Sequence, residues 1–122
     1  MNVGGHILLV EDDYAIRETV ADVLEGEGFE VDCASNGAEA LRQLDEGASK
    51  PSVILLDLMM PVMDGWAFRT AQRLDPRISG IPVVVVSAGT DGPVAGLEPA
   101  AFLPKPFDLD RLLAMVGRYC VP

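Results

Sequence analysis

Short apolar runs alternate with amphipathic stretches along the chain, and this order constrains the fold more than any other feature. The strand-like runs are HILLV, FEVDCA, SVILLD, IPVVVV and AAFL, at residues 6–10, 29–34, 52–57, 81–86 and 100–103. Several are apolar throughout, which is typical of parallel strands covered by helices on both faces. The order therefore predicts an α/β fold, doubly wound around a five-stranded parallel sheet.

The stretches between the runs have helical periodicity. Residues 16–24 place one apolar stripe on a helix that ends at Gly26, and Asp13 stands where it begins, at the end that favours negative charge. Three candidate N-cap residues stand before the later helical stretches: Asn36, Asp64 and Asp108. These signals predict helices after the first three runs and after the last.

The connection between the fourth and fifth runs is different. Its sequence TDGPVAGLEPAA contains Gly92, Pro93, Gly96 and Pro99, which leave only a few consecutive residues that could be helical. We therefore expect the fourth of the flanking helices to be short or missing.

Length and charge exclude several classes of protein. The 122 residues are expected to form a single domain over residues 1–122. No apolar run approaches the roughly 18 residues of a membrane helix, and MNVGGHILLVEDD lacks the basic start of a secretion signal. The formal net charge of −10 repels a phosphate backbone. We expect a cytoplasmic protein that binds neither membrane nor nucleic acid directly.

Polar and charged side chains lie at or just after the ends of four predicted strands. Glu11 and Asp12 follow the first, Asp57 ends the third, Ser87 follows the fourth and Lys105 follows the fifth. Ligands of an open parallel sheet bind outside the carboxyl ends of its strands. These five side chains are therefore predicted to converge on one edge of the sheet.

The chemistry of this set points to phosphoryl transfer. Three carboxylates at close range repel one another unless a cation is bound, and Mg²⁺ is usually held by one or two carboxylates, waters and a phosphate oxygen. Lys105 adds an ammonium group and Ser87 a hydroxyl donor. A carboxylate nucleophile surrounded by such groups can accept a phosphoryl group. The sequence thus predicts Asp57 as an acceptor that becomes an aspartyl phosphate.

Four motifs in order give the chain a family resemblance: ILLVEDD, VILLDLMMPVMDG, VVVVSAG and FLPKPF. Together they resemble the response regulator receiver domains of two-component signal transduction, the CheY-like proteins. The resemblance covers essentially the whole chain. It implies the flavodoxin-like strand order 2-1-3-4-5.

The resemblance also implies a set of metal ligands. Glu11 and Asp12 would form the acid pair, with Asp12 the more direct ligand. Asp57 would be both a metal ligand and the phosphoryl acceptor, and the backbone carbonyl of Met59 would complete the protein's part of the Mg²⁺ shell.

The remaining implied roles concern catalysis and switching. Ser87 and Lys105 would bind phosphoryl oxygens from opposite sides. Phe102 would be the aromatic residue whose rotamer follows phosphorylation, so that Ser87 and Phe102 form the switch. A cis peptide bond is implied between Lys105 and Pro106.

The expected function is that of a receiver that catalyses only its own phosphorylation and dephosphorylation and is otherwise not an enzyme. Its phosphoryl donor would be a histidine kinase or a histidine phosphotransfer protein, and its downstream target an unidentified protein. Two alternatives remain open: a receiver cut from a hybrid kinase or larger regulator, and a pseudo-receiver that binds partners without phosphorylation. A phosphatase needs an acid where Met59 stands, and a flavin site needs a glycine loop where residues 11–13 are acidic.

Overall fold

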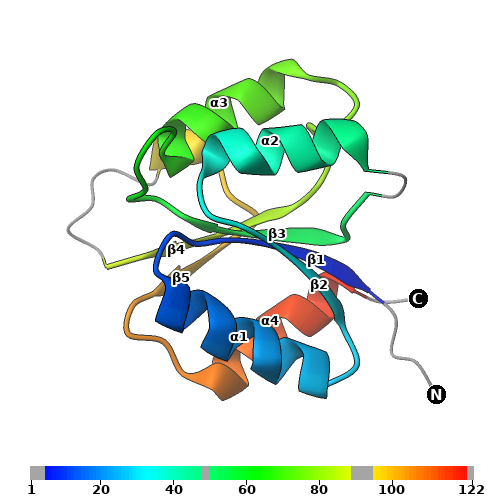
Figure 1. Cartoon of the computed structure of the whole chain (residues 1–122), viewed down its shortest axis with the longest axis vertical. Coiled ribbons are helices and arrows are strands. Elements are labelled where there is room, and N and C mark those ends of the chain that lie inside the picture. The colour runs from blue at the N-terminus through cyan, green and yellow to red at the C-terminus, as the bar shows by residue number, and fades with distance from the viewer. Residues whose placement is uncertain (1–4, 48–49, 89–94, 121–122) are drawn as a thin grey trace.

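A computed structural model describes residues 5–47, 50–88 and 95–120 of the chain (Figure 1). Five strands form one parallel sheet: β1 (His6–Val10), β2 (Glu30–Ala34), β3 (Val53–Asp57), β4 (Val83–Ser87) and β5 (Ala101–Pro104). Their order is β2-β1-β3-β4-β5, and neighbouring strands pair in parallel. The predicted fold class and strand order are confirmed.

Helices cover both faces of the sheet. They are α1 (Tyr14–Gly26), α2 (Gly37–Glu46), α3 (Gly65–Leu74) and α4 (Leu109–Tyr119). Figure 1 shows α2 and α3 on one face and α1 and α4 on the other. Successive residues of a strand point to opposite faces, so Leu9 and Leu55 pack with the α1–α4 layer, whereas Leu8 and Ile54 pack with the α2–α3 layer. Each layer therefore has its own apolar core.

The expected capping residues begin the four α-helices. Each accepts a hydrogen bond from a backbone N–H of the first turn: Asp13 from Ile16 (3.0 Å), Asn36 from Glu39 (2.9 Å), Asp64 from Ala67 (2.9 Å) and Asp108 from Asp110 (2.7 Å). Such bonds satisfy donors that have no partner within the helix. Because these caps follow the strand ends, they fix where each chain segment turns away from the carboxyl edge of the sheet.

The predicted bounds of the fourth strand were wrong by one or two residues at each end. β4 begins at Val83 because Pro82 has no N–H to donate, although its carbonyl accepts from the N–H of Ile54 (2.9 Å). The strand continues through Ser87, whose carbonyl accepts from the N–H of Lys105 (2.8 Å). The predicted second, third and fifth runs each begin one residue before the observed strand, and β5 extends to Pro104.

The connection from β4 to β5 departs from the other crossovers, as its glycines and prolines predicted. In its described part, residues 95–100, the helical element is one 3₁₀ turn, η1 (Ala95–Leu97); Gly92 and Pro93 lie outside the described residues. Arg69 of α3 donates to the carbonyls of Leu97 and Glu98, both at 2.9 Å. Arg69 of α3 thus supplies hydrogen-bond donors to backbone carbonyls of a segment whose helical turn is too short to pair all of them internally.

No helix in the part of the chain that the structure describes is both long and apolar enough to cross a membrane.

Candidate functional site

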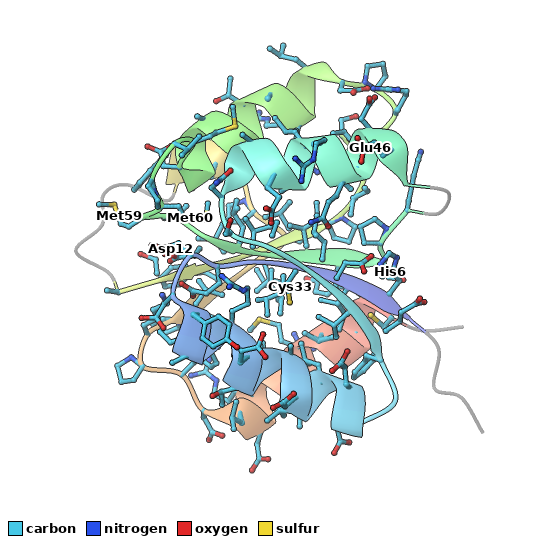
Figure 2. All side chains as sticks on the ribbon, viewed as in Figure 1. His6, Asp12, Cys33, Glu46, Met59 and Met60 are labelled. Atoms are coloured by element: carbon cyan, nitrogen blue, oxygen red, sulfur yellow. The ribbon has the colours of Figure 1, made fainter. Side chains whose placement is uncertain are left out.

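The predicted site residues lie at the carboxyl ends of the parallel strands. Glu11 and Asp12 directly follow β1, Asp57 is the last residue of β3, and Ser87 is the last residue of β4. Lys105 directly follows β5. Asp12 and Met59 stand at one end of the sheet and His6 at the other (Figure 2). The sheet topology therefore brings segments distant in sequence to one edge.

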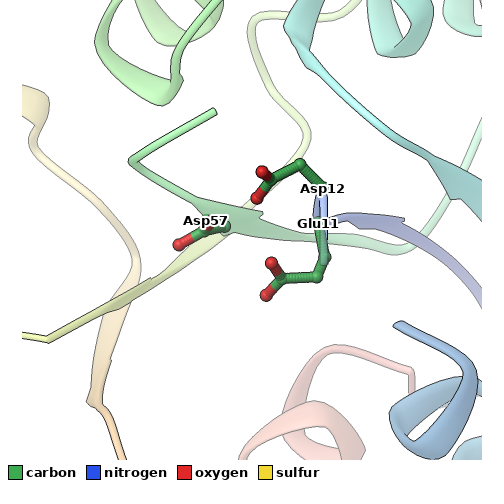
Figure 3. A group of neighbouring side chains, drawn as sticks. All are labelled: Glu11, Asp12 and Asp57. Atoms are coloured by element: carbon green, nitrogen blue, oxygen red, sulfur yellow. The ribbon is translucent and has the colours of Figure 1, made fainter. Parts of the chain in front are cut away.

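Three carboxylates meet at this edge (Figure 3). Glu11, Asp12 and Asp57 each offer one oxygen, and these atoms all lie within 4.8 Å of one another. Glu11 and Asp57 are each only 4% exposed, whereas Asp12 is open to solvent. Oxygen ligands gathered this closely, partly buried and with one open side, fit a hard divalent cation that retains water.

Lys105 lies between the two buried acids. Its Nζ donates to Oδ1 of Asp57 at 3.1 Å and to Oε1 of Glu11 at 3.3 Å. The convergence of Lys105 and Asp57 on this edge was predicted, whereas a hydrogen bond from Lys105 to Glu11 was not. The predicted cis peptide bond between Lys105 and Pro106 is present. One ammonium group thus faces two carboxylates, which leaves the site with excess negative charge.

Burial, together with this excess of negative charge, changes the pKa values of the site residues. Burial is the main cause that raises the pKa of Glu11, and the carboxylate of Asp57 raises it further. Burial also raises the pKa of Asp57, against the opposing attraction of Lys105. The pKa of Lys105 is raised because the two acids together outweigh the effect of burial on the ammonium group. A bound cation would relieve the conflict between the acids, so the residues present fit a metal ion.

The two predicted switch residues occupy different environments. Ser87 is fully buried at the end of β4, beside the β5 strand end that leads to Lys105. Phe102 lies in β5 opposite Val85, and the residue is 37% exposed. Ser87 and Phe102 thus lie on the neighbouring strands β4 and β5, and β4 also pairs with β3, the strand that carries Asp57. Their roles in switching stay predictions.

The loop after β3 brings the start of α3 against Asp57. The N–H of Gly65 donates to the carbonyl of Leu58 at 2.9 Å. A Cβ at position 65 would lie 2.7 Å from the carbonyl oxygen of Asp57, so only glycine allows this approach. Met59 lies in this loop between Asp57 and Gly65, and the residue is 56% exposed. The ligand role of its carbonyl stays a prediction.

Sequence reasoning missed Arg17 of α1. Its Nη1 donates to the carbonyl of Glu11 at 2.8 Å and lies 3.5 Å from the carbonyl of Asp12. The apolar stripe of the helix did not point to it. The available signal was its position four residues after the N-cap Asp13, in the first turn of α1, where a side chain can reach back toward the acidic segment.

An apolar groove of about 600 Å³ opens beside Lys105. It is lined by one face of α1, by the residue directly after β4 and by the segment that leads into α4: Ala15, Ile16, Thr19, Val20, Ala88, Lys105, Pro106, Phe107 and Leu109. The groove thus connects an apolar surface of the α1–α4 layer directly with the acidic site.

The strand order and the acidic carboxyl edge define a CheY-like α/β domain. The family model of the response regulator receiver domain matches residues 7–117. The chain therefore belongs to this family, whose members receive signals in two-component systems.

Two curated relatives illustrate the similarity. The chain is 40% identical over 115 residues to Response regulator Rre1 of Synechocystis, covering 90% of this chain and 49% of that protein. It is 43% identical over 114 residues to the transcriptional regulatory protein PrrA of Mycobacterium leprae, covering 90% of this chain and 47% of that protein. The chain spans about half the length of the curated relatives it matches.

Two solved structures show the same fold. The chemotaxis response regulator CheY4 of Vibrio cholerae aligns with a TM-score of 0.83 and 30% identity, covering 95% of this chain and 98% of the other. The receiver domain of a sensor histidine kinase from Pseudomonas aeruginosa aligns with a TM-score of 0.86 and 25% identity, covering 95% and 97%. That receiver has a magnesium ion coordinated in its active-site cleft.

Proposed function

We propose that this receiver domain accepts a phosphoryl group on Asp57 and thereby switches its conformation to control a protein partner. The observation that carries the proposal is the arrangement around Asp57. Its carboxyl group is buried, contacts Lys105 at 3.1 Å and shares a cation-sized space with Glu11 and Asp12. Membership of the receiver family supports the same function.

The reaction transfers one phosphoryl group and leaves the donor's nitrogen free. An oxygen of Asp57 attacks the phosphorus of a phosphohistidine, the P–O bond forms, and the P–N bond breaks with its electron pair remaining on the imidazole. Lys105 remains paired with Asp57 at the start of the reaction, and its ammonium group can then pair with a phosphoryl oxygen as negative charge develops there. Ser87 donates a hydrogen bond from its hydroxyl to a second phosphoryl oxygen. The barrier falls because these groups are already positioned where charge gathers.

The metal proposed for the acid cluster is Mg²⁺. Glu11, Asp12, Asp57 and the carbonyl of Met59 would hold it, and when bound it would neutralise charge on the carboxylates and the phosphoryl oxygens. The 4.8 Å grouping of the carboxylate oxygens and the magnesium ion in the Pseudomonas receiver support this choice. Because three carboxylates gather at this site, phosphorylation of Asp57 is proposed to require the bound ion.

The conformational response would run from Ser87 to Phe102. A phosphoryl group adds charge and acceptor oxygens that draw the Ser87 hydroxyl toward Asp57, and the vacated space would let the half-exposed Phe102 ring turn inward. Beryllofluoride, a phosphoryl mimic, should therefore shift the aromatic NMR resonances of Phe102. Resonances that stay in place would argue against this switch.

The donor is proposed to be a histidine kinase or a histidine phosphotransfer protein that seats a helix in the apolar groove beside Lys105. The groove is apolar and adjoins Asp57 through Lys105, so a helix within it could present a phosphohistidine to the acid. Ala15→Arg should fill the groove and slow transfer from the protein donor by about tenfold or more. Phosphorylation by acetyl phosphate, which needs no docking, should be unchanged, and equal slowing of both would contradict the assignment.

The direct test of the function is intact mass spectrometry after incubation with acetyl phosphate and Mg²⁺. We expect one added phosphoryl group on the wild type and none on Asp57→Asn. Asp64→Asn is the matched control, because Asp64 is a carboxylate of the same loop that caps α3 and is not one of the three acids of the cluster. Absence of phosphorylation in the wild type would favour the pseudo-receiver, a binding module without this chemistry.

The wider setting also belongs to the proposal. The domain would act on no substrate other than itself, in the cytoplasm, either as a separate regulator or within a hybrid kinase or longer regulator. The half-length match to curated relatives and the kinase receiver among similar structures both support the larger setting. Cell fractionation and the mass of the native protein would test location and size.

A further inference from the structure

Arg17 contacts the backbone of two proposed metal ligands but has no role in the proposed reaction. It lies in the first turn of α1, half-buried, and its Nη1 donates to the carbonyl of Glu11 at 2.8 Å. The same nitrogen lies 3.5 Å from the carbonyl of Asp12. These two consecutive residues supply two of the three carboxylates of the acid cluster. One guanidinium group therefore holds the backbone from which both acids project.

The turn around these acids is tied together by further hydrogen bonds. The N–H of Asp13 donates to Oε2 of Glu11 at 3.2 Å, and the N–H of Arg17 donates to the carbonyl of Asp13 at 2.9 Å. The ring of Tyr14 lies 5.4 Å from the guanidinium carbon of Arg17, a cation–π distance. Arg17 is thus held from both sides, by the acidic turn and by the aromatic ring.

We infer that Arg17 is a positioning residue for the metal-binding acid pair, an inference that rests on the proposed use of Glu11 and Asp12 as metal ligands. Fixing the two carbonyls fixes the planes of the peptide groups that flank Asp12, and hence the direction in which the side chain leaves the backbone. Without this tether, mutual repulsion would separate the carboxylates whenever no cation is bound.

Charge and position have opposite consequences for metal binding, which makes the inference testable. A positive guanidinium near the cluster repels a divalent cation, so charge alone predicts that its removal tightens Mg²⁺ binding. Positioning predicts the reverse, because groups that orient metal ligands are typically worth about 10–100-fold in affinity. The sign of the change decides between the two.

The experiment is calorimetric titration of the full chain with MgCl₂, with no phosphoryl donor. Arg17→Met should weaken Mg²⁺ binding by about tenfold. Arg17→Lys keeps the charge but not the planar fork, and should also bind more weakly than the wild type. Arg111→Met, which removes one charge from an exposed position of α4, should change affinity less than twofold. Thermal unfolding of each variant shows that the titrated protein is folded.

The possible outcomes separate this inference from the proposed function. Unchanged or tighter Mg²⁺ binding in Arg17→Met overturns the positioning role, and wild-type affinity in Arg17→Lys does so as well. If the wild type binds Mg²⁺ but takes no phosphoryl group from acetyl phosphate, the proposed function fails, while weaker binding in both Arg17 variants still supports the inference.

Discussion

Two regions of the molecule pair one cation with two carboxylates at about the same distances. At the carboxyl edge of the sheet, Lys105 lies 3.1 and 3.3 Å from Asp57 and Glu11. Beyond the end of α3, Arg77 lies 3.0 Å from Asp45 and 2.9 Å from Asp75. The side chains of Glu11 and Asp57 are each 5% exposed, whereas those of Asp45 and Asp75 are 64% and 27% exposed. The sheet edge also has the carboxylate of Asp12 nearby, but the main difference between the two groups is burial.

This difference reverses the effect on the acids. At the surface, hydrogen bonds from Arg77 lower the pKa of Asp75, as expected for a carboxylate with a cationic partner. At the sheet edge, burial raises the pKa of Glu11 and Asp57 although both contact Lys105. Water removal therefore outweighs pairing there. An arrangement that works against stability in this way is typical of a functional site.

The largest effect on stability is expected at the sheet edge. Asp57→Asn removes a buried charge whose ionised form the folded state disfavours, while Lys105 keeps Glu11 as its partner. The free energy of unfolding at neutral pH should rise by about 1–2 kcal/mol. Urea unfolding in the absence of divalent cations measures it, and a loss of stability would show that the Asp57–Lys105 contact is net favourable.

The difference in free energy of unfolding between the wild type and Asp57→Asn should depend on pH. Because the pKa of Asp57 is raised in the folded state, its contribution to stability is fully present below the unfolded carboxyl pKa, about 4. It is lost as the pH rises through the folded value. The wild type should therefore lose stability relative to Asp57→Asn as the pH rises from about 4 toward neutrality. A difference between the two proteins that stays constant over this range would contradict the raised pKa.

An intermediate effect is expected where an arginine binds backbone instead of carboxylates. Arg69 is half-buried and donates to the carbonyls of Leu97 and Glu98. Arg69→Met leaves these carbonyls without that donor and should lower the free energy of unfolding by about 1 kcal/mol. Hydrogen exchange within residues 95–100 should rise at the same time. Arg73→Met, at a more exposed position of the same helix, should have less effect on both.

The smallest effect is expected at the exposed ion pairs. Arg77→Ala removes both contacts of that group, yet water screens them and the side chain regains its freedom. The midpoint of urea unfolding should not change measurably. A clear loss of stability would mean that exposure is not what distinguishes the two regions.

Sequence reasoning reached much of the fold because local signals and topology agree. The apolar runs, the caps at Asn36 and Asp64 and the glycines and prolines of the last crossover each act over a few residues. The convergence of Asp57 and Lys105 followed from the parallel sheet alone. Local patterns were enough to predict the architecture, because the carboxyl ends of all the strands in a parallel sheet lie at the same edge.

What sequence reasoning missed depends on side-chain reach across elements. The contact between Lys105 and Glu11 joins β5 to β1, which are not neighbours in the sheet. Arg69 reaches a crossover 28 residues away in sequence. Arg17 looks from sequence like any charged residue on an exposed helix face. Such contacts depend on strand register and side-chain rotamers, which the hydrophobic periodicity of the sequence does not predict.

The hydrogen bond from the N–H of Lys105 to the carbonyl of Ser87 joins the two residues proposed to grip the phosphoryl group. Because this bond couples their backbones, a shift of either residue toward Asp57 would displace the other. If phosphorylation draws Ser87 toward Asp57 as proposed, the pull would pass through Lys105 into β5, the edge strand of the sheet. The proposed switch would then include a displacement of the β5 backbone in addition to the rotation of Phe102.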